Sequence, residues 1–312
     1  MTDKKASNPS NDRHNSPTNG LLAGHQVNRI GFGAMQLPGP HVWGPPKDRN
    51  TALSVLKTAI ELGVNHIDTA QYYGPDVSNQ LIKEALHPYP ENLVLVSKIG
   101  AQRDATGGWI PAQRPEELVS GVEDNLRCLK TERISVVNLR MMPSIPGGGA
   151  IPENQQVLLD DQIAAMIELR EAGKIEQFGI SNASMEQVQK AIPAGIACVQ
   201  NAYSLLNRKD EDILQLCLQH QIAWVPFFPL GSAGFPGMNQ VTKHPLVLQI
   251  ASQLEVTPAQ VGLAWLLHHA PNILLIPGTS SPAHLKQNME AGKISLNTQL
   301  LNALDQLANM EA

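Results

Sequence analysis

Residues 65–74 read Asn-His-Ile-Asp-Thr-Ala-Gln-Tyr-Tyr-Gly, and residues 93–98 read Leu-Val-Leu-Val-Ser-Lys. Each stretch is a short apolar run that ends in charged or hydroxylated residues. This is typical of a buried parallel strand that delivers side chains to a site at its carboxyl end. The first stretch delivers Asp68 and then Tyr73, and the second delivers Lys98. We therefore expect these three side chains to meet at one edge of a parallel sheet.

Asp68, Tyr73 and Lys98 together would make a proton donor. A phenol with a pKa near ~10 is a poor acid at neutral pH. A lysine cation ~4 Å away, at an effective dielectric of ~20, is worth roughly 4 kcal/mol, or about 3 pKa units. A carboxylate beside the lysine would keep it charged and aimed. Such a site protonates an oxyanion, which suits carbonyl reduction. The alternative, three unrelated strand-end residues, is disfavoured because successive strands carry them.

The same alternation of a short apolar run and an amphipathic helical segment continues along the chain. It predicts eight strands, each followed by a helix, and therefore an α/β fold of the (β/α)8 TIM barrel type. A doubly wound open sheet is the alternative, disfavoured because no Gly-x-Gly-x-x-Gly sequence follows the first predicted strand. The predicted strands are residues 31–37, 65–69, 93–99, 134–141, 175–181, 197–203, 223–228 and 273–276. The predicted helices are residues 50–62, 115–129, 160–172, 185–192, 210–221 and 258–269, one that begins at Pro282, and residues 298–308.

Composition divides the chain into a tail and one domain. Residues 1–22 are rich in Ser, Asn, Asp, Lys and Pro, and we expect them to be a disordered N-terminal tail. Residues 23–312 are then expected to form a single barrel domain, which is an ordinary size for this fold.

Charge and hydropathy exclude several classes of partner. The chain is 42% hydrophobic and 16% charged, with a net charge of −5, so we expect neither a nucleic-acid surface nor a polybasic membrane anchor. It has no apolar run near 18 residues and no apolar signal segment, which predicts a cytoplasmic location. The three cysteines are widely spaced, which predicts small core residues in a reducing compartment. The histidines show no metal-binding spacing, so no metal is expected.

The predicted carboxyl ends of the strands form a ring of polar groups with one aromatic side chain. The last of them, Gly278-Thr279-Ser280-Ser281-Pro282, is a small hydroxyl-rich turn that leads into a helix. Free backbone N–H groups and the helix dipole would make this turn an anion site, as is common in barrels after strands 7 and 8. A plain helix cap is the alternative. The other members of the ring are Met35, Asp68, Tyr73, Lys98, Arg140, Ser181, Asn182, Gln200, Asn201, Phe227, Pro229, Leu230 and Gly231.

Taken together, these pieces resemble the aldo-keto reductases over residues 25–310. The resemblance rests on residues 31–35, 66–74, 96–98, 179–182, 199–201, 229–231 and 276–281. It implies a monomeric barrel that uses NADP(H) to reduce a small-molecule carbonyl substrate, an aldehyde or a ketone.

The resemblance also implies a role for each matching residue. It places the general acid on Tyr73 rather than Tyr72, with Lys98 and Asp68 as its partners. Ser181, Asn182 and Gln200 match the residues that hold the nicotinamide amide, and Phe227 stands where an aromatic ring stacks on the nicotinamide. The remaining cofactor contacts that it implies are Gly33, Met35, Asp68, Pro229, Leu230, Gly231, Gly278, Thr279, Ser280, Gln287 and Asn288.

Two positions depart from the family pattern. Arg140 stands where the family has a catalytic histidine; an arginine is neither acid nor base near neutral pH, but it can orient and polarise a carbonyl. At the adenosine 2′-phosphate, where many members have a lysine and an arginine, this chain has Gly278 and His284, and Lys286 is the expected substitute. With its arginine, the chain looks like a bacterial subgroup that includes pyridoxal reductases, so pyridoxal is the expected substrate.

Trp43, in the loop after the first strand, is a candidate wall of the substrate site, and Trp109 is a weaker candidate. Tyr73 and Arg140 are the other expected substrate contacts. Two alternative functions stay open at this point. One is a Schiff-base aldolase using Lys98, which would need a lysine without a carboxylate partner. The other is a non-catalytic NADP-binding regulatory subunit.

Overall fold

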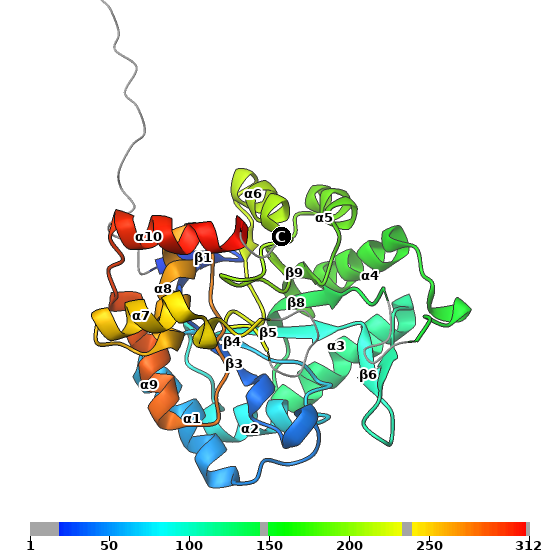
Figure 1. Ribbon diagram of the computed structural model, residues 1–312. Helices are drawn as coiled ribbons and strands as arrows, with labels where there is room; N and C mark the ends of the chain where they lie inside the picture. The colour runs from blue at the N-terminus through cyan, green and yellow to red at the C-terminus, as the bar shows by residue number, and fades with distance from the viewer. Residues whose placement is uncertain (1–18, 144–148, 233–238, 310–312) are drawn as a thin grey trace, which may run out of the picture.

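The computed structural model describes residues 19–143, 149–232 and 239–309, and Figure 1 shows helices surrounding a curled parallel sheet. Most of the predicted tail, residues 1–18, lies outside the described residues. Within the described residues, seven strands follow the order β11-β10-β9-β8-β5-β4-β3. They are β3 (Phe32–Gly33), β4 (His66–Asp68), β5 (Val94–Ile99), β8 (Ile134–Arg140), β9 (Ile175–Ser181), β10 (Cys198–Gln200) and β11 (Ala223–Trp224).

The eighth predicted strand closes the ring. Residues 273–276 form parallel bridges on both sides, from Ile273 to Trp224 of β11 and from Leu275 to Ile30 beside β3. The predicted barrel is therefore confirmed, although this last segment pairs only through isolated bridges. The first predicted strand, residues 31–37, is shorter than expected and turns at Ala34 into a 3₁₀ helix. There a Cβ on Gly33 would overlap the carbonyl oxygen of Ile276, so only glycine allows the two strands to approach this closely.

The helices of the described residues match the predicted ones to within a few residues, because their start and stop signals are local. In α3, for example, Pro115 opens the helix, Glu116 and Glu117 lie in its first turn, and Lys130 ends it in a left-handed conformation. Two further helices, α2 and α7, are not among the predicted ones. The helices are α1 (Arg49–Glu61), α2 (Val77–Leu86), α3 (Pro115–Leu129), α4 (Leu159–Glu171), α5 (Met185–Ala191), α6 (Glu211–Gln219), α7 (Pro245–Gln253), α8 (Pro258–His269), α9 (Pro282–Glu290) and α10 (Thr298–Asp305).

A hairpin of β1 (Asn19–Leu22) and β2 (His25–Asn28) precedes the barrel. The predicted boundary of the tail at residue 22 is therefore wrong, because residues 19–22 pair with residues 25–28. The pattern contains no clear sign of this hairpin beyond the apolar Leu21-Leu22 pair. Leu22 and Val27 pack against the first residues of the barrel strands, so the hairpin covers the amino ends of the strands. The opposite, carboxyl ends are thereby left as the place for a site.

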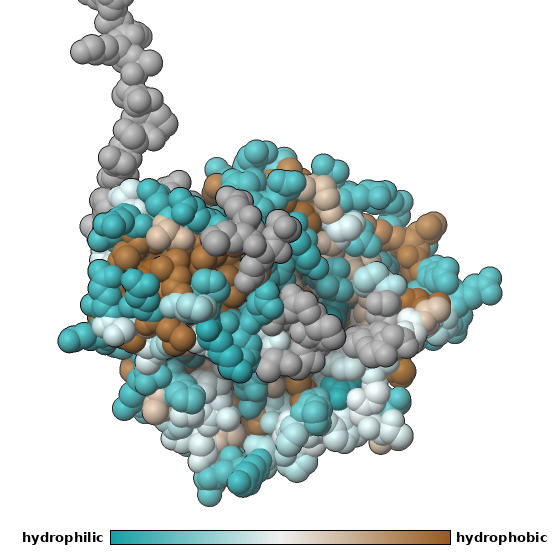
Figure 2. Space-filling view, in the orientation of Figure 1, coloured by the Kyte–Doolittle hydropathy of each residue, from teal (hydrophilic) through white to brown (hydrophobic). Residues whose placement is uncertain are grey.

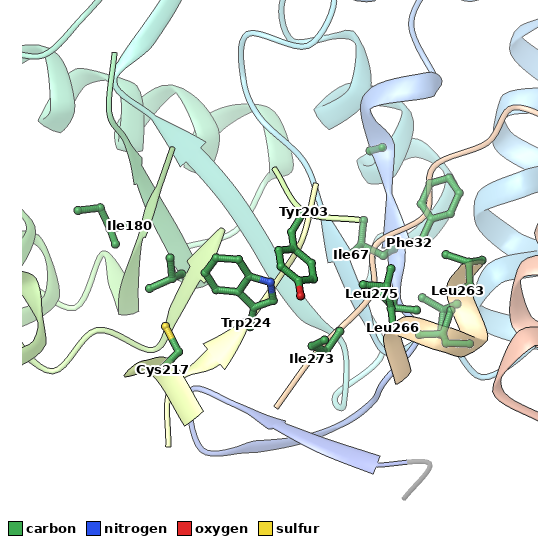
Figure 3. Close-up of a cluster of buried hydrophobic side chains, with 14 of the residues drawn as sticks. Phe32, Ile67, Ile180, Tyr203, Cys217, Trp224, Leu263, Leu266, Ile273 and Leu275 are labelled. Atoms are coloured by element: carbon green, nitrogen blue, oxygen red, sulfur yellow. The ribbon is translucent and has the colours of Figure 1, made fainter. Parts of the chain in front are cut away.

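The main core lies between the sheet and the helices. Figure 3 shows part of it, where Trp224 lies close to Tyr203 and where Phe32 and Leu275 belong to neighbouring strands. The three cysteines, Cys128, Cys198 and Cys217, are buried and free, as their spacing predicts.

The face shown in Figure 2 mixes polar and apolar side chains. Apolar ones gather on its left over α7, where Leu248 is 48% exposed. Among the helices of the described residues, none combines the length and apolar character that crossing a membrane requires.

His66 is a packed barrel residue. It is 1% exposed, and its Nε2 donates to the backbone carbonyl of Asn28 at 3.0 Å. A Cβ on Gly31 would overlap its ring, so a glycine is required there. Burial lowers the pKa of His66 to about 4. His66 is therefore neutral in the folded barrel at neutral pH, while the unfolded chain can protonate it below its ordinary pKa of about 6.5.

This difference predicts a loss of stability in acid. The free energy of unfolding is unaffected by this group above pH ~6.5 and falls by about 3 kcal/mol as the pH is lowered toward ~4, because the pKa of His66 is about 4 in the folded barrel. His66→Gln, which keeps a hydrogen-bond donor but cannot be protonated, should show a shallower fall in the free energy of unfolding between pH 7 and 4. Urea unfolding at several pH values measures it, with the half-exposed His25→Gln as the control. Equal slopes for wild type and His66→Gln would contradict the assignment.

Candidate active site

A cavity of about 460 Å³ opens at the carboxyl ends of the strands. Its lining comes from the ends of several barrel strands, from the first residues of α8, and from His284, Gln287 and Asn288 of α9. The lining residues that the sequence predicts are Gly33, Met35, Asp68, Tyr73, Lys98, Arg140, Phe227, Pro229, Leu230, Gly231, Gly278, Thr279, Gln287 and Asn288. The lining also includes Trp109, the weaker of the two candidate tryptophans. The lining residues that are not among the predicted site residues include Gln36, Tyr72, Phe228, Thr242, Thr257, Pro258, Ala259 and His284.

A buried ion pair forms the floor of the cavity. Lys98 Nζ donates to Asp68 Oδ1 and, at 3.0 Å, to the backbone carbonyl of Thr69. The second oxygen of Asp68 accepts from Gln200 Nε2 at 2.8 Å, across the barrel. Asp68 and Lys98 are each 3% exposed. The two charges therefore compensate each other in a place where neither could remain unpaired.

Tyr73 lies beside this pair, but not as predicted. Lys98 Nζ is 5.0 Å from the centre of the Tyr73 ring, and no described residue hydrogen-bonds the phenol oxygen. Burial raises the pKa of Tyr73 above its ordinary value, the negative charge of Asp68 adds to the rise, and Arg140 opposes it. The predicted lowering of this pKa by Lys98 is therefore wrong for this structure. The reason is that Lys98 donates to Asp68 and to the Thr69 carbonyl, and the Asp68 carboxylate offsets its charge.

Arg140 ends β8 and contributes a cation to the cavity. Its side chain makes no ion pair or hydrogen bond with a described residue, and its Nε is buried without a partner. Its guanidinium lies 6.0 Å from the centre of the Trp109 ring. Gln113 Nε2 donates to the Arg140 carbonyl at 3.0 Å and so anchors the strand end. The position that the sequence predicts for Arg140 is correct, and its charge has no protein counterion among the described residues.

Tyr72, which directly precedes the predicted acid Tyr73, also lines the cavity but is not among the predicted site residues. Its ring meets Tyr73 and Trp109 edge to face, with centroid distances of 5.4 and 5.2 Å. Its hydroxyl is buried and has no partner among the described residues. Burial raises the pKa of Tyr72, and Arg140 opposes the rise. Tyr72 and Tyr73 are therefore both protonated at neutral pH.

Trp43, the predicted substrate wall, does not line the cavity, and Trp109 does. The Trp43 ring instead packs against the guanidinium of Arg103 at 5.3 Å. The same guanidinium lies 4.4 Å from the centre of the Trp109 ring. The sequence alone does not reveal which tryptophan lines the cavity, because both tryptophans follow strands of the barrel.

Two predicted amide-binding residues keep free polar atoms. Ser181 Oγ and Gln200 Oε1 are buried, belong to residues that are not part of the cavity lining, and have no hydrogen-bond partner among the described residues. Buried polar groups are rarely left unpaired, so these atoms fit a bound group such as a carboxamide. Asn182 lies beside them in a left-handed conformation, and its Nδ2 donates to the Met141 carbonyl at 3.0 Å. The residues present therefore fit the nicotinamide amide that the resemblance implies.

The opposite end of the cavity reaches α9. Thr279 is buried, and its Oγ1 accepts from the backbone N–H of Ser281, the residue that caps α9. His284 lines the cavity, whereas Ser280 and Lys286 are exposed and lie outside its lining. The small turn thus stands at a helix N-terminus, as predicted, with His284 nearer to the cavity than Lys286.

Comparison with known proteins agrees with this geometry. The sequence model of the aldo/keto reductase family matches residues 29–309. The chain is 46% identical to pyridoxine 4-dehydrogenase of Escherichia coli over 91% of this chain and 96% of that protein. It is 34% identical to an uncharacterised oxidoreductase of Schizosaccharomyces pombe over 91% and 88%. The solved aldo/keto reductase of Klebsiella pneumoniae in complex with NADP and acetate superposes with a TM-score of 0.77 at 26% identity, over 93% and 95%. The chain therefore belongs to the aldo/keto reductase family.

Proposed function

We propose that this chain reduces pyridoxal to pyridoxine with NADPH as the reductant. The observation that carries the proposal is a cavity in which a buried, protonated phenol lies beside Arg140, an arginine that no described residue pairs with. The similarity to a pyridoxine 4-dehydrogenase supports the substrate. The solved relative that holds NADP supports the cofactor. When bound, NADPH supplies a hydride to the carbonyl carbon.

Tyr73 is the proposed proton donor to the carbonyl oxygen. Its raised pKa keeps the phenol protonated at neutral pH, so the donor is always loaded. Lys98 Nζ lies over the face of the Tyr73 ring, and its ion pair with Asp68 forms a fixed polar surface beneath the phenol. The pair does not take up the phenol's proton. Arg140 stays charged and so takes no part in proton transfer.

The cofactor is proposed to lie along the cavity between two ends. Ser181, Asn182 and Gln200 would hold the carboxamide through their free or exposed polar atoms, and Phe227 would cover the nicotinamide ring. The turn before α9 would hold the phosphate of the adenosine half. The further contacts proposed are Gly33, Met35, Asp68, Pro229, Leu230, Gly231, Gly278, Thr279, Ser280, Lys286, Gln287 and Asn288.

Arg140 is the proposed selector for pyridoxal. The phenolic hydroxyl of pyridoxal lies ortho to the aldehyde and is readily ionised. Its oxygen therefore suits a guanidinium that has no counterion among the described residues. A Schiff-base aldolase is less favoured, because Lys98 is paired with Asp68 and a nucleophilic lysine must be free. A regulatory subunit would bind NADP(H) without turnover, and the assays below separate it from an enzyme. A monomeric state and a cytoplasmic location complete the proposal.

Tyr73→Phe should lower aldehyde reduction by ~10²–10⁴-fold, the usual loss for a general acid, and should leave the dissociation constant of NADPH unchanged. Tyr72→Phe is the matched control, since it removes the neighbouring phenol. NADPH oxidation and cofactor fluorescence measure the two quantities. A larger loss in Tyr72→Phe would move the acid to Tyr72. Because burial raises the pKa of Tyr73, the rate should show no decline near pH 7–9 from loss of its proton.

Arg140→Met should lower kcat/KM for pyridoxal by about 10- to 150-fold, because a charge-assisted hydrogen bond contributes roughly 1.5–3 kcal/mol. Benzaldehyde-type substrates without the hydroxyl should lose much less. Steady-state kinetics on both substrates tests this. If kcat/KM fell equally for both classes of substrate, Arg140 would act on the carbonyl or on the fold and not on the phenolic oxygen.

Thr279→Ala, Ser280→Ala, Lys286→Ala and His284→Ala should each weaken NADPH more than NADH. The reason is that the 2′-phosphate is proposed to lie at the N-terminus of α9, where dipole and charge favour an anion. Dissociation constants for both cofactors measure the ratio for each variant. Ratios equal to that of the wild type would place the 2′-phosphate elsewhere in the cavity.

A further inference from the structure

A short hairpin carries the tryptophan of the cavity wall. It consists of β6 (Ala101–Arg103) and β7 (Trp109–Pro111), with Arg103 opposite Trp109. Its turn is held by Asp104, whose carboxylate accepts from the backbone N–H groups of Thr106 and Gly108, each at 2.8 Å. The turn is thus held by its own hydrogen bonds. The hairpin adjoins the barrel strands only at its base. The position of Trp109 therefore depends on contacts between the hairpin and other segments of the protein.

The side chain of Arg103 supplies such a connection. Its Nε donates to the Gly107 carbonyl at 3.0 Å, within the hairpin. Its two terminal nitrogens donate to the carbonyls of Val42 at 3.4 Å and His41 at 3.2 Å, in the loop after β3. The guanidinium also lies between two indole rings, 5.3 Å from Trp43 and 4.4 Å from Trp109. One side chain thus joins two loops by hydrogen bonds and by stacking.

The loop that receives Arg103 is strained. His41 and Val42 both have positive φ, 58° and 59°, which is rare for any residue other than glycine and exceptional for a β-branched one. Such conformations are costly and persist only where surrounding contacts enforce them. Here the carbonyls of both residues accept from Arg103. The strained backbone therefore presents two acceptors to one guanidinium.

The same loop is bound on its other side to the segment of the proposed acid. The Val42 carbonyl also accepts from the N–H of Gly74 at 3.1 Å, and Gly44 N–H donates to the Gly74 carbonyl at 3.1 Å. Gly74 directly follows Tyr73 in the chain. A continuous set of contacts thus runs from Trp109 through Arg103 and Val42 to the backbone beside Tyr73.

We propose that Arg103 is a positioning residue for substrate recognition. It straps the β6–β7 hairpin to residues 41–43 and so fixes the Trp109 ring, a wall of the cavity, relative to Tyr73. The class of substrate that this favours is a planar aromatic aldehyde, which can lie against the Trp109 ring, rather than a small aliphatic aldehyde. The inference rests on the proposed reductase function and adds a residue that touches neither substrate nor cofactor.

The test is a double-mutant cycle in the full chain with Arg103→Met and Trp109→Leu. Each single variant should raise KM for pyridoxal by roughly tenfold with kcat within about twofold, because uniform binding is lost while the chemistry remains. In Arg103→Met, which leaves the cavity lining intact, the NADPH dissociation constant and the kinetics with propionaldehyde should stay within about twofold of wild type. In the Trp109→Leu background, Arg103→Met should have almost no further effect, because coupled residues are not additive.

Three outcomes would overturn the proposal: additive losses in the cycle, an unchanged KM for pyridoxal in Trp109→Leu, or a rise in KM for propionaldehyde in Arg103→Met as large as the rise for pyridoxal. If Arg103→Met does not fold, Arg103→Lys keeps the charge but not the forked donors, and its KM should still rise. Arg127→Met, which removes an exposed arginine from α3, controls for the loss of a surface charge. Failure of wild-type protein to reduce any aldehyde would instead defeat the proposed function.

Discussion

The buried ion pair of Asp68 and Lys98 is the interaction on which the site depends. Two charges at 3% exposure are tolerated only because each finds several partners: Lys98 also meets the Thr69 carbonyl, and Asp68 meets Gln200. Removing one member of such a pair typically costs roughly 3–5 kcal/mol. Since the partners come from β4, β5 and β10, the pair joins both sides of the barrel and cannot be separated from the fold.

This compensation determines the electrostatics around it. Because Asp68 cancels the charge of Lys98, the cavity keeps Arg140 as a cation that no described protein group neutralises. The phenol of Tyr73 stays protonated as a result of its burial and the nearby carboxylate. A protonated donor and a guanidinium without a partner among the described residues suit a substrate that brings both a carbonyl oxygen and a negative charge.

The barrel strands bring the chemistry, whereas the loops shape the space in which it happens. Trp109 comes from a hairpin outside the barrel, and Arg103 ties that hairpin to a strained loop whose other side is bonded to Gly74. Binding and catalytic residues often lie on loops held by a rigid scaffold, because loop sequences can vary without disturbing the core. Here the connection between loops is made by side chains that are far apart in the sequence.

The sequence by itself determined the barrel, most helix boundaries, and the arrival of Asp68, Tyr73, Lys98 and Arg140 at one edge. These features follow from the periodicity of apolar residues, from helix-capping residues and from the residues at strand ends, all of which are signals between residues close together in the sequence. Only the tertiary structure decided that Lys98 donates to Asp68 and the Thr69 carbonyl, and that Trp109, not Trp43, borders the cavity. It also decided that residues 19–22 cover the barrel. Each of these depends on which side chains meet across long separations, and no local pattern encodes that choice.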